Sequence, residues 1–459
     1  MITSSLDWLV PELMDIIRLF SAEDLKITHG FEEEGGQFCN TFSFGGREYV
    51  YRDTPRSPIA YKSLVKRTAK LSLYKLLSAF YKKELPWGSL TGIRPTRLAY
   101  QELEWTADFA PLFEELGVSK ENTELVRRTI ACQKGIYERR EGNVDLFVSL
   151  PFCPTKCVYC SFVTAPIDRT RKYLPDYLTA LEQELASSAP LIKNLRSVYI
   201  GGGTPFALEA EELERVLKAI APLRTNGCEY TVEAGRPDVF TREKLELCKQ
   251  YGVTRICINA QSFSNKTLEA IGRKHTAQQV KEAFEMAKPY GFTVNCDLIA
   301  GLTGETYGEF CQSIDEAVSL SPQNITVHTL CLKKGARLKE ETSSLEEGEM
   351  GNMIAYSREK LSAAGYEPYY LYRQKYMAGA HENVGWTKKG YASVYNIDVM
   401  EECADNLAVG ANAITKKVFL EEGRIERIGS PKDIPTYLNK VDTLIEEKKK
   451  LFSTSLRSE

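Results

Sequence analysis

The sequence of 459 residues has no run of about 18 apolar residues, the length that a membrane-spanning helix needs. Residues Met1 to Asp7 show no basic region followed by an apolar stretch, so we expect no signal peptide. Neither sign of charge dominates, because 59 basic residues stand against 62 acidic ones and the net charge is only -3. This balance gives no case for nucleic acid as a partner of the whole chain. We therefore expect a cytoplasmic protein that binds no nucleic acid and has no membrane span.

The composition is that of an ordinary globular protein, with 43% hydrophobic, 26% charged and 10% aromatic residues. It excludes a wholly disordered chain, a collagen-like chain and a small chain held by disulfides. The length is too great for one core and predicts two to four domains. Cysteine is the unusual residue, because 12 cysteines are many for a reducing compartment that disfavours disulfides. Nine of them are scattered and suit buried free thiols, whereas three fall within eight residues.

Residues 1–140 predict a separate N-terminal α+β module. An amphipathic helix opens it, and a hairpin that turns at Gly45-Gly46 joins Phe38–Phe44 to Glu48–Tyr51. Two interpretations stay open for a second helix, which we call the basic helix: a solvated surface, or a binding surface for an anionic substrate or partner. This basic helix covers Tyr61–Leu85 and carries Lys62, Lys66, Arg67, Lys70, Lys75, Lys82 and Lys83.

Residues 141–340 change to short apolar runs that alternate with amphipathic helices. This alternation predicts βα units with a parallel sheet, an α/β fold. Six units suffice for a partial (β/α)6 barrel of the TIM type, with chemistry at the C-terminal ends of the strands. Residues 341–459 are expected to form a mostly helical C-terminal extension that completes the substrate cleft. The six predicted strands are Leu146–Leu150, Ser197–Ile200, Glu229–Glu233, Arg255–Ile258, Val294–Ile299 and Ile325–Leu330.

The three clustered cysteines, Cys153, Cys157 and Cys160, follow the first predicted strand with the spacing C-x3-C-x2-C. A structural zinc site needs four ligands, usually as two pairs, and the sequence offers no second pair. A disulfide conflicts with the compartment and with the odd number, and a redox C-x-x-C pair would leave Cys153 unexplained. Three thiolates on one loop can instead hold three irons of a [4Fe–4S] cluster and leave the fourth iron open for a chelating cosubstrate.

Polar or flexible residues mark the following strands. Gly201–Thr204 ends the second strand, where glycines allow a ligand to approach exposed backbone N–H groups, or simply form a tight turn. Glu233 ends the third strand, where it is either a solvent-facing turn residue or a ligand-binding carboxylate. A carboxylate that enters an apolar barrel needs a cation or a hydroxyl as partner. Gln261 follows the fourth strand, and Asp297 lies inside the fifth. Arg273 is the candidate partner of Asp297, in an ion pair that is either structural or part of a binding site.

These motifs resemble the radical S-adenosylmethionine (SAM) superfamily, and within it the oxygen-independent coproporphyrinogen III dehydrogenases. The resemblance rests on Pro151–Cys160, Gly201–Pro205, Gln261–Phe263, Ile271–His275 and Asp297–Leu302. The chain is most similar to the HemZ-type branch, on Leu90–Thr96, Glu233–Asp238, Tyr370–Lys375 and Glu382–Gly385. The resemblance covers nearly the whole chain and is densest from 144 to 335.

The resemblance implies that Cys153, Cys157 and Cys160 bind a [4Fe–4S] cluster. The implied reaction is the oxidative decarboxylation of two propionates of coproporphyrinogen III, or a related tetrapyrrole, to vinyls, giving protoporphyrinogen IX. A 5′-deoxyadenosyl radical from SAM would abstract the hydrogen atom, and a flavodoxin- or ferredoxin-type protein would donate the electron. The residues that would contact SAM are Gly202, Gly203, Thr204, Glu233, Gln261, Arg273 and Asp297.

Two further expectations concern partners. We expect a monomer. The substrate would carry four carboxylates, so Arg94, Arg97 or the basic helix could help to bind it.

The chain departs from the best-known dehydrogenases at two places. Phe162 stands where they have a further cysteine, and Phe147 and Ser149 stand where they have tyrosine and histidine. A phenylalanine at the first of these places also occurs in the related haem-chaperone branch. Two alternatives therefore stay open: a haem-binding or haem-trafficking protein without decarboxylase activity, and a radical SAM enzyme that acts on another tetrapyrrole.

A haem-binding protein needs a ligand for the haem iron, and the chain has four histidines. His29, His275 and His328 fall in predicted sheet or barrel segments, where a histidine is more often satisfied within the core. His381 lies in a loop rich in glycine and tyrosine and is the candidate ligand.

Overall fold

The computed structural model describes residues 1–55, 58–92, 94–162, 164–331, 347–374 and 381–453. The chain divides into two compact units, Met1–Arg127 with Arg373–Tyr376, and Arg128–Tyr372 with Met377–Glu459. The domain boundary predicted at 340–341 lies outside the described residues, so the division into three domains stays a prediction. None of the helices in the described ranges combines the length and the apolar character that crossing a membrane requires.

The first unit contains a four-stranded sheet in the order β1-β2-β3-β4. The predicted hairpin is confirmed, because β3 and β4 pair antiparallel with Phe44 opposite Arg47. The basic helix is also confirmed and ends at Tyr81. The elements are β1 (Ile2–Ser4), α1 (Val10–Leu19), β2 (Ile27–Glu34), β3 (Gln37–Phe44), β4 (Arg47–Asp53), α2 (Tyr61–Tyr81), α3 (Pro95–Leu103), α4 (Ala110–Glu115) and α5 (Lys120–Gln133), the last of which runs into the second unit.

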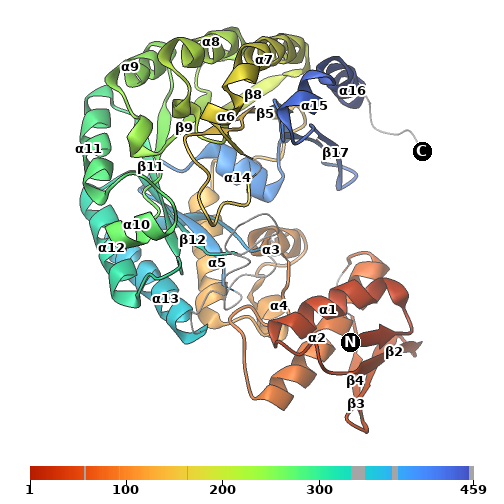
Figure 1. Ribbon diagram of the computed structural model, residues 1–459. Helices are drawn as coiled ribbons and strands as arrows, with labels where there is room; N and C mark the ends of the chain where they lie inside the picture. The colour runs from red at the N-terminus through yellow and green to blue at the C-terminus, as the bar shows by residue number, and fades with distance from the viewer. Residues whose placement is uncertain (56–57, 93, 163, 332–346, 375–380, 454–459) are drawn as a thin grey trace. The chain divides into compact units, whose positions relative to one another are not determined.

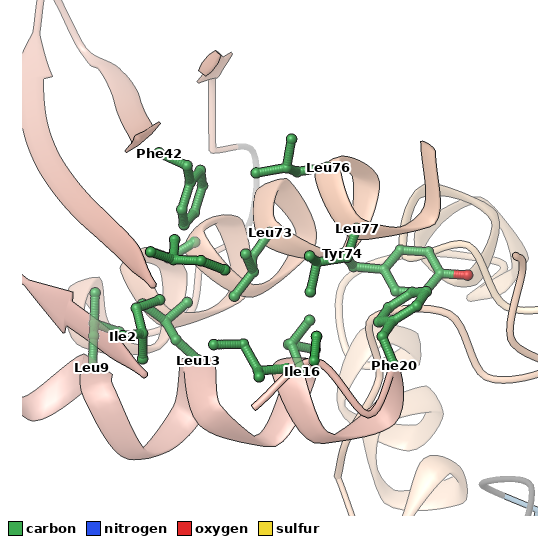
Figure 2. Close-up of a cluster of buried hydrophobic side chains, with 14 of the residues drawn as sticks. Ile2, Leu9, Leu13, Ile16, Phe20, Phe42, Leu73, Tyr74, Leu76 and Leu77 are labelled. Atoms are coloured by element: carbon green, nitrogen blue, oxygen red, sulfur yellow. The ribbon is translucent and has the colours of Figure 1, made fainter. Parts of the chain in front are cut away.

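The core of the first unit forms where α1 meets α2 (Figure 2). Leu13 and Ile16 of α1 are fully buried, because their spacing places them on one face of the helix. Leu73 and Leu77 of α2 face them, and Phe42 of β3 covers the cluster from the sheet. This unit therefore has a hydrophobic interior of its own.

The second unit is built on an eleven-stranded sheet in the order β13-β14-β12-β11-β10-β9-β8-β5-β15-β16-β17. Its first half consists of β5 (Asn143–Leu150), β6 (Phe152–Cys153), β7 (Ala165–Pro166), α6 (Ile167–Thr170), α7 (Leu174–Ser188), β8 (Asn194–Gly202), α8 (Ala210–Ile220), β9 (Glu229–Gly235), α9 (Arg242–Gln250), β10 (Arg255–Ile258), α10 (Asn265–Ala270) and α11 (Ala277–Ala287). Its second half consists of β11 (Thr293–Ala300), α12 (Tyr307–Leu320), β12 (Asn324–Thr329), α13 (Glu347–Ala363), β13 (Glu367–Tyr372), β14 (Asn383–Thr387), α14 (Val394–Glu401), β15 (Asp405–Val409), β16 (Ile414–Phe419), β17 (Arg424–Gly429), α15 (Ile434–Leu438) and α16 (Val441–Ser453).

The six strands predicted from the sequence, β5 and β8 to β12, are neighbours in this sheet and are parallel. Helices α7, α8, α9, α11 and α12 follow one another along the outside of the sheet (Figure 1). The predicted α/β barrel fold is therefore confirmed. Because the strands are parallel, the residues at their C-terminal ends lie along one edge.

The C-terminal extension contains more sheet than its predicted, mostly helical character suggests. It adds β14 and β13 beyond β12, and it adds β15, β16 and β17 beyond β5. These strands have only five or six residues each and lack a clear alternation of apolar and polar positions. Pairing with a sheet formed by distant residues stabilises them, and the local sequence does not carry that information.

Candidate functional site

The three clustered cysteines lie on the loop that leaves the C-terminal end of β5. The short strands β6 and β7 pair with each other and close this cysteine loop (residues 153–160) at its base. Cys157 is buried, and Cys153 and Cys160 are partly buried. Burial raises the pKa of Cys153 and of Cys160, and the neighbouring Cys157 adds to both rises. The three thiols are therefore close enough to interact, and a metal that binds them has to displace their protons.

The described residues contain no three His, Cys, Asp or Glu side chains placed around a single metal ion. A [4Fe–4S] cluster asks for a different arrangement, because each of its cysteines binds a separate iron. Three interacting thiols on one loop suit that arrangement, so the donor set fits the predicted cluster.

A buried arginine fastens the cysteine loop to the barrel. Arg236 directly follows β9 and is only 2% exposed. Its guanidinium donates to the Thr155 hydroxyl at 2.5 Å and pairs with the Asp238 carboxylate at 2.7 Å. Thr155 lies between Cys153 and Cys157, so Arg236 holds the middle of the loop. Outer partners of this kind keep metal ligands in a fixed arrangement.

The glycine run after β8 packs against the cysteine loop. The backbone N–H groups of Gly203 and Thr204 donate to backbone carbonyls of residues 150 and 152, at 2.8 and 2.7 Å. A Cβ on residue 203 would lie 2.4 Å from the Phe152 carbonyl oxygen, so only glycine fits there. The Thr204 hydroxyl lies 3.5 Å from the Cys153 sulfur. The fold therefore uses two of the N–H groups expected to be exposed, those of Gly203 and Thr204. Contacts of Gly202, Gly203 and Thr204 with SAM stay a prediction.

Glu233, at the end of β9, meets a hydroxyl, as the sequence predicts. It accepts a hydrogen bond from the Tyr199 hydroxyl at 2.5 Å. Burial raises the pKa of Glu233 to about 7, although the Tyr199 hydrogen bond opposes the rise. Tyr199 in turn stacks on Tyr395 with 4.4 Å between ring centroids, and Phe147 stacks beside both at 6.2 Å. Near neutral pH this carboxyl group is therefore balanced between its charged and neutral forms, beside an aromatic wall.

Gln261 follows β10 in a strained conformation. Its φ of +68° lies in the left-handed region that residues other than glycine rarely adopt. Its side chain is 7% exposed, and the side-chain oxygen has no hydrogen-bond partner among the residues that the structure describes. The side-chain oxygen of Asn259 and the Nε of Arg273 are also buried without a hydrogen-bond partner among the described residues. Unsatisfied buried polar atoms are costly, so these three point to a polar ligand.

The predicted ion pair between Arg273 and Asp297 is wrong. Arg273 donates instead to the Asn259 carbonyl and to the Tyr159 hydroxyl, the latter at 3.3 Å, and it also interacts with Cys157. The reason is local, because the turn after α10 is bonded to the cysteine loop: the backbone N–H of residue 158 donates to the carbonyl of residue 271 at 3.2 Å. Arg273 is therefore held against the loop and not against β11.

Asp297 on β11 takes other partners. The Asn295 amide donates to its carboxylate at 2.8 Å, and His328 Nε2 lies 3.8 Å away. Burial raises the pKa of Asp297, but His328, Asn295 and Thr326 outweigh that effect and lower it overall. The second ring nitrogen of His328 lies 3.3 Å from the Tyr372 hydroxyl. A chain of carboxylate, imidazole and phenol thus replaces the expected arginine.

Comparisons with known proteins agree with this geometry. The family model described as the radical SAM superfamily matches residues 147–317, which include the cysteine loop and strands β8 to β11. Over 411 residues the chain is 35% identical to the "Oxygen-independent coproporphyrinogen-III oxidase-like protein HemZ" of Bacillus subtilis, covering 84% of this chain and 80% of that protein. The chain belongs to the HemZ-type branch of the radical SAM superfamily.

One further sequence relative and one solved structure are also similar to this radical SAM protein. The haem chaperone HemW of Bacillus subtilis is 31% identical over 333 residues, which cover 60% of this chain and 86% of HemW. The solved structure of the Escherichia coli coproporphyrinogen III oxidase HemN, a radical SAM enzyme, aligns with a TM-score of 0.55 at 20% identity, covering 71% of this chain and 73% of that one. The second likeness establishes the fold alone.

Three residues of this radical SAM site were not among the predicted contacts. Tyr199 and His328 lie inside β8 and β12, where the strand pattern marks them as ordinary sheet residues. Arg236 offered a signal, because it stands at a strand end between a glycine and a proline and two residues before an aspartate. A buried charged residue at that edge of a parallel sheet needs an oppositely charged partner, and Asp238 is that partner.

Proposed function

We propose that the protein is a radical SAM oxidoreductase that decarboxylates two propionates of coproporphyrinogen III, giving protoporphyrinogen IX in haem biosynthesis. The observation that carries the proposal is the extent of the likeness to the HemZ protein, which spans 84% of this chain. The likeness to the haem chaperone HemW spans 60%. The sequence likeness to HemZ therefore extends over more of the chain than the likeness to HemW, including more of the regions outside the barrel.

In this proposal the chain's own residues prepare the cofactor site. Cys153, Cys157 and Cys160 hold three irons of the cluster, and Arg236 and Arg273 keep their loop against the barrel. When bound, the cluster and SAM supply the electron and the radical that removes a hydrogen atom from a propionate. To become a vinyl group, the propionate also releases CO2 and one further electron, which an external one-electron acceptor would take up.

Other residues would receive SAM and exclude water. The unpartnered side-chain oxygen of Gln261 can accept an N–H or O–H of SAM without first losing another hydrogen bond. Glu233 can accept a further hydrogen bond once it is ionised, which its pKa of about 7 permits near neutral pH. Tyr199 and Tyr395 form an apolar surface next to it, which limits the access of water to a reactive intermediate.

The proposal extends to the surroundings of the reaction. A reduced flavodoxin- or ferredoxin-type protein would donate electrons in the cytoplasm. All 12 cysteines are free in the structure, and a reducing compartment keeps them so.

A haem-trafficking protein of the same fold is the second candidate. It is favoured by the HemW relatives and by Phe162, which is 66% exposed beside the cysteine loop. The histidines give it little support, because His29 and His275 are 1% and 3% exposed. His381 is only partly buried, and a Cβ on Gly351 of α13 would lie 3.6 Å from its ring.

One experiment separates the candidates. The protein is reconstituted without oxygen with iron and sulfide, and then given SAM, a strong reductant and coproporphyrinogen III. We expect protoporphyrinogen IX together with 5′-deoxyadenosine. Stoichiometric haem binding without turnover of SAM would support the trafficking protein instead. Turnover of SAM with another tetrapyrrole alone would point to a different substrate.

A further inference from the structure

The first unit contains a cavity of about 530 Å³, and none of its lining residues belongs to the candidate radical SAM site. We call it the N-terminal cavity. Helices α1 and α2, whose apolar faces meet in Figure 2, supply most of its charged side chains. The basic helix is thus not wholly exposed to solvent, because three of its basic residues line this cavity. The charged residues of the lining are Glu12, Asp15, Lys66, Arg67, Lys70 and Arg94.

The acidic residues of the lining do not balance the basic ones. Two lysines share Glu12, whose carboxylate oxygens lie 3.4 Å from Lys66 Nζ and 3.5 Å from Lys70 Nζ. Asp15 lies 3.7 Å from Arg18, which is outside the lining. The lining thus holds four basic groups and two acidic groups, and Asp15 acts on Lys70 as well as on Arg18.

Arg67 is the basic residue of the lining that a ligand could pair with directly. It makes no hydrogen bond or ion pair with any residue that the structure describes, and it feels Glu102 and Glu115 only at longer range. Burial lowers the pKa of Arg67, and burial likewise lowers the pKa of Lys70 although Glu12 opposes that change. A partly buried cation that lacks a direct hydrogen bond or ion pair is stabilised when an anion pairs with it.

The rest of the lining sets the character of that anion. Ile59, Leu90, Leu98 and Leu116 give the cavity an apolar part, and Ser63, Ser89 and Thr91 add polar groups. A volume of about 530 Å³ suits one small organic molecule. We propose that the N-terminal cavity binds a small organic anion that carries carboxylate or phosphate groups on an apolar body. This proposal does not rest on the proposed reaction, because every lining residue that the structure describes belongs to the first unit and none of them is in the candidate radical SAM site.

Calorimetric titration of the full chain tests the proposal with two probes, benzene-1,2,4-tricarboxylate and phenyl phosphate. We expect at least one of them to bind with a stoichiometry of one, and the tighter probe tells carboxylate from phosphate. The variant Arg67→Gln should weaken binding about tenfold, the value of one charged hydrogen bond. The matched control is Lys75→Gln, because Lys75 is exposed on the same helix and is not part of the lining. It should change the affinity by less than about twofold.

Several results would overturn the proposal. If neither probe gives a heat of binding, the cavity does not bind an anion of this kind and the proposal is wrong. Equal probe affinity in the parent and in folded Arg67→Gln would also contradict the proposal. So would an equal loss of affinity in Lys75→Gln and Arg67→Gln, because it would indicate attraction to the whole charged surface and not to the cavity. If Arg67→Gln does not fold, Lys66→Gln replaces it, since Lys66 is 42% exposed at the edge of the cavity. Unchanged affinity in that variant would also contradict the proposal.

Discussion

Two groups of buried polar side chains in the second unit differ in how completely they are satisfied. In the first, which we call the Glu184 network, one carboxylate oxygen accepts from Lys448 at 2.5 Å. The other oxygen accepts from the Gly410 backbone N–H at 2.7 Å and from the Tyr437 hydroxyl at 2.8 Å. Glu184 is fully buried and Lys448 is 1% exposed, and each has its partners within the fold.

The second group lies beside the cysteine loop and is not satisfied in this way. Gln261 and Asn259 each keep a buried side-chain oxygen without a partner, and Arg273 keeps a buried Nε, within the ranges described. In the first group, both oxygens of a buried carboxylate have hydrogen-bond partners within the fold. The unsatisfied atoms of the second group lie beside the cysteine loop, where a bound polar ligand would supply their missing hydrogen bonds.

The largest effect that we predict is the loss of iron from the cysteine loop. In Cys157→Ala the cluster loses a ligand, so we expect iron binding after reconstitution and cleavage of SAM to fall to background. The control is Cys248→Ala, since Cys248 is fully buried on α9, away from the loop. It should keep its iron. Full iron content in Cys157→Ala, measured by a colorimetric iron assay, would remove the cysteine loop from the site.

The Glu184 network should matter for stability alone. Lys448→Met leaves the buried carboxylate of Glu184 without its cation, so we expect the free energy of unfolding to fall by about 3–5 kcal/mol. The neighbouring Lys449 is exposed, and its pair with Glu446 at 2.8 Å is also exposed. Lys449→Met should therefore cost less than about 1 kcal/mol. Urea denaturation of both variants measures this difference.

The same two variants also test whether the Glu184 network and the group beside the cysteine loop act separately. Folded Lys448→Met should bind as much iron per chain as the parent, because its network serves the fold. Equal stability of Lys448→Met and Lys449→Met would show that the buried pair has no special role. A selective loss of iron in folded Lys448→Met would show that the two groups are not separate.

Arg236 should affect the cluster more than the fold. Arg236→Lys keeps the charge but loses the forked contacts with Thr155 and Asp238. We expect the reconstituted variant to lose iron to a chelator about tenfold faster than the parent, as is usual when an outer partner of a metal site is removed. Arg215→Lys is the control, because Arg215 binds Glu182 at 2.9 Å on an exposed surface. Identical rates for all three proteins would mean that Arg236 does not position the loop.

The smallest predicted effect concerns the pH dependence of stability. Burial raises the pKa of Glu305 from 4.5 to about 8, and Glu309 adds to the rise although Ser262 opposes it. The folded chain thus keeps a proton that the unfolded chain releases. The resulting stabilisation is complete below about pH 4.5 and is lost as the pH rises towards 8.

Glu305→Gln should remove this dependence, because an amide does not ionise. Between about pH 6 and about pH 7 the parent should lose about 1 kcal/mol more of its free energy of unfolding than Glu305→Gln. Glu309→Gln should keep most of the parent's pH dependence, because burial is the largest cause of the raised pKa of Glu305 and Glu309 only adds to it. Parallel pH profiles of the parent and Glu305→Gln would contradict the raised pKa.

The sequence predicts the scaffold of this molecule well and its polar contacts less well. β10 runs over the predicted residues Arg255–Ile258, because short apolar runs in alternation with amphipathic helices leave little choice of fold. The cysteine loop follows β5 for the same reason. β15 was missed because it depends on pairing with β5, more than 250 residues earlier.

Side-chain partners depend on three-dimensional details that spacing does not contain. Asp297 needed a partner, and the sequence offered Arg273, but a backbone hydrogen bond ties the turn of Arg273 to the cysteine loop. His328 supplies the partner instead, because β12 lies next to β11 and places Ile299 opposite His328. That register becomes visible only in the folded sheet.

The most direct test of this account is electron paramagnetic resonance of the reconstituted, reduced protein with and without SAM. A cluster held by the cysteine loop predicts about four irons per chain and the spectrum of a reduced [4Fe–4S] cluster. It also predicts that SAM changes this spectrum, because the open iron gains a ligand. A protein that binds less than about one iron per chain, or whose cluster spectrum is unaffected by saturating SAM, would contradict the assignment of the site.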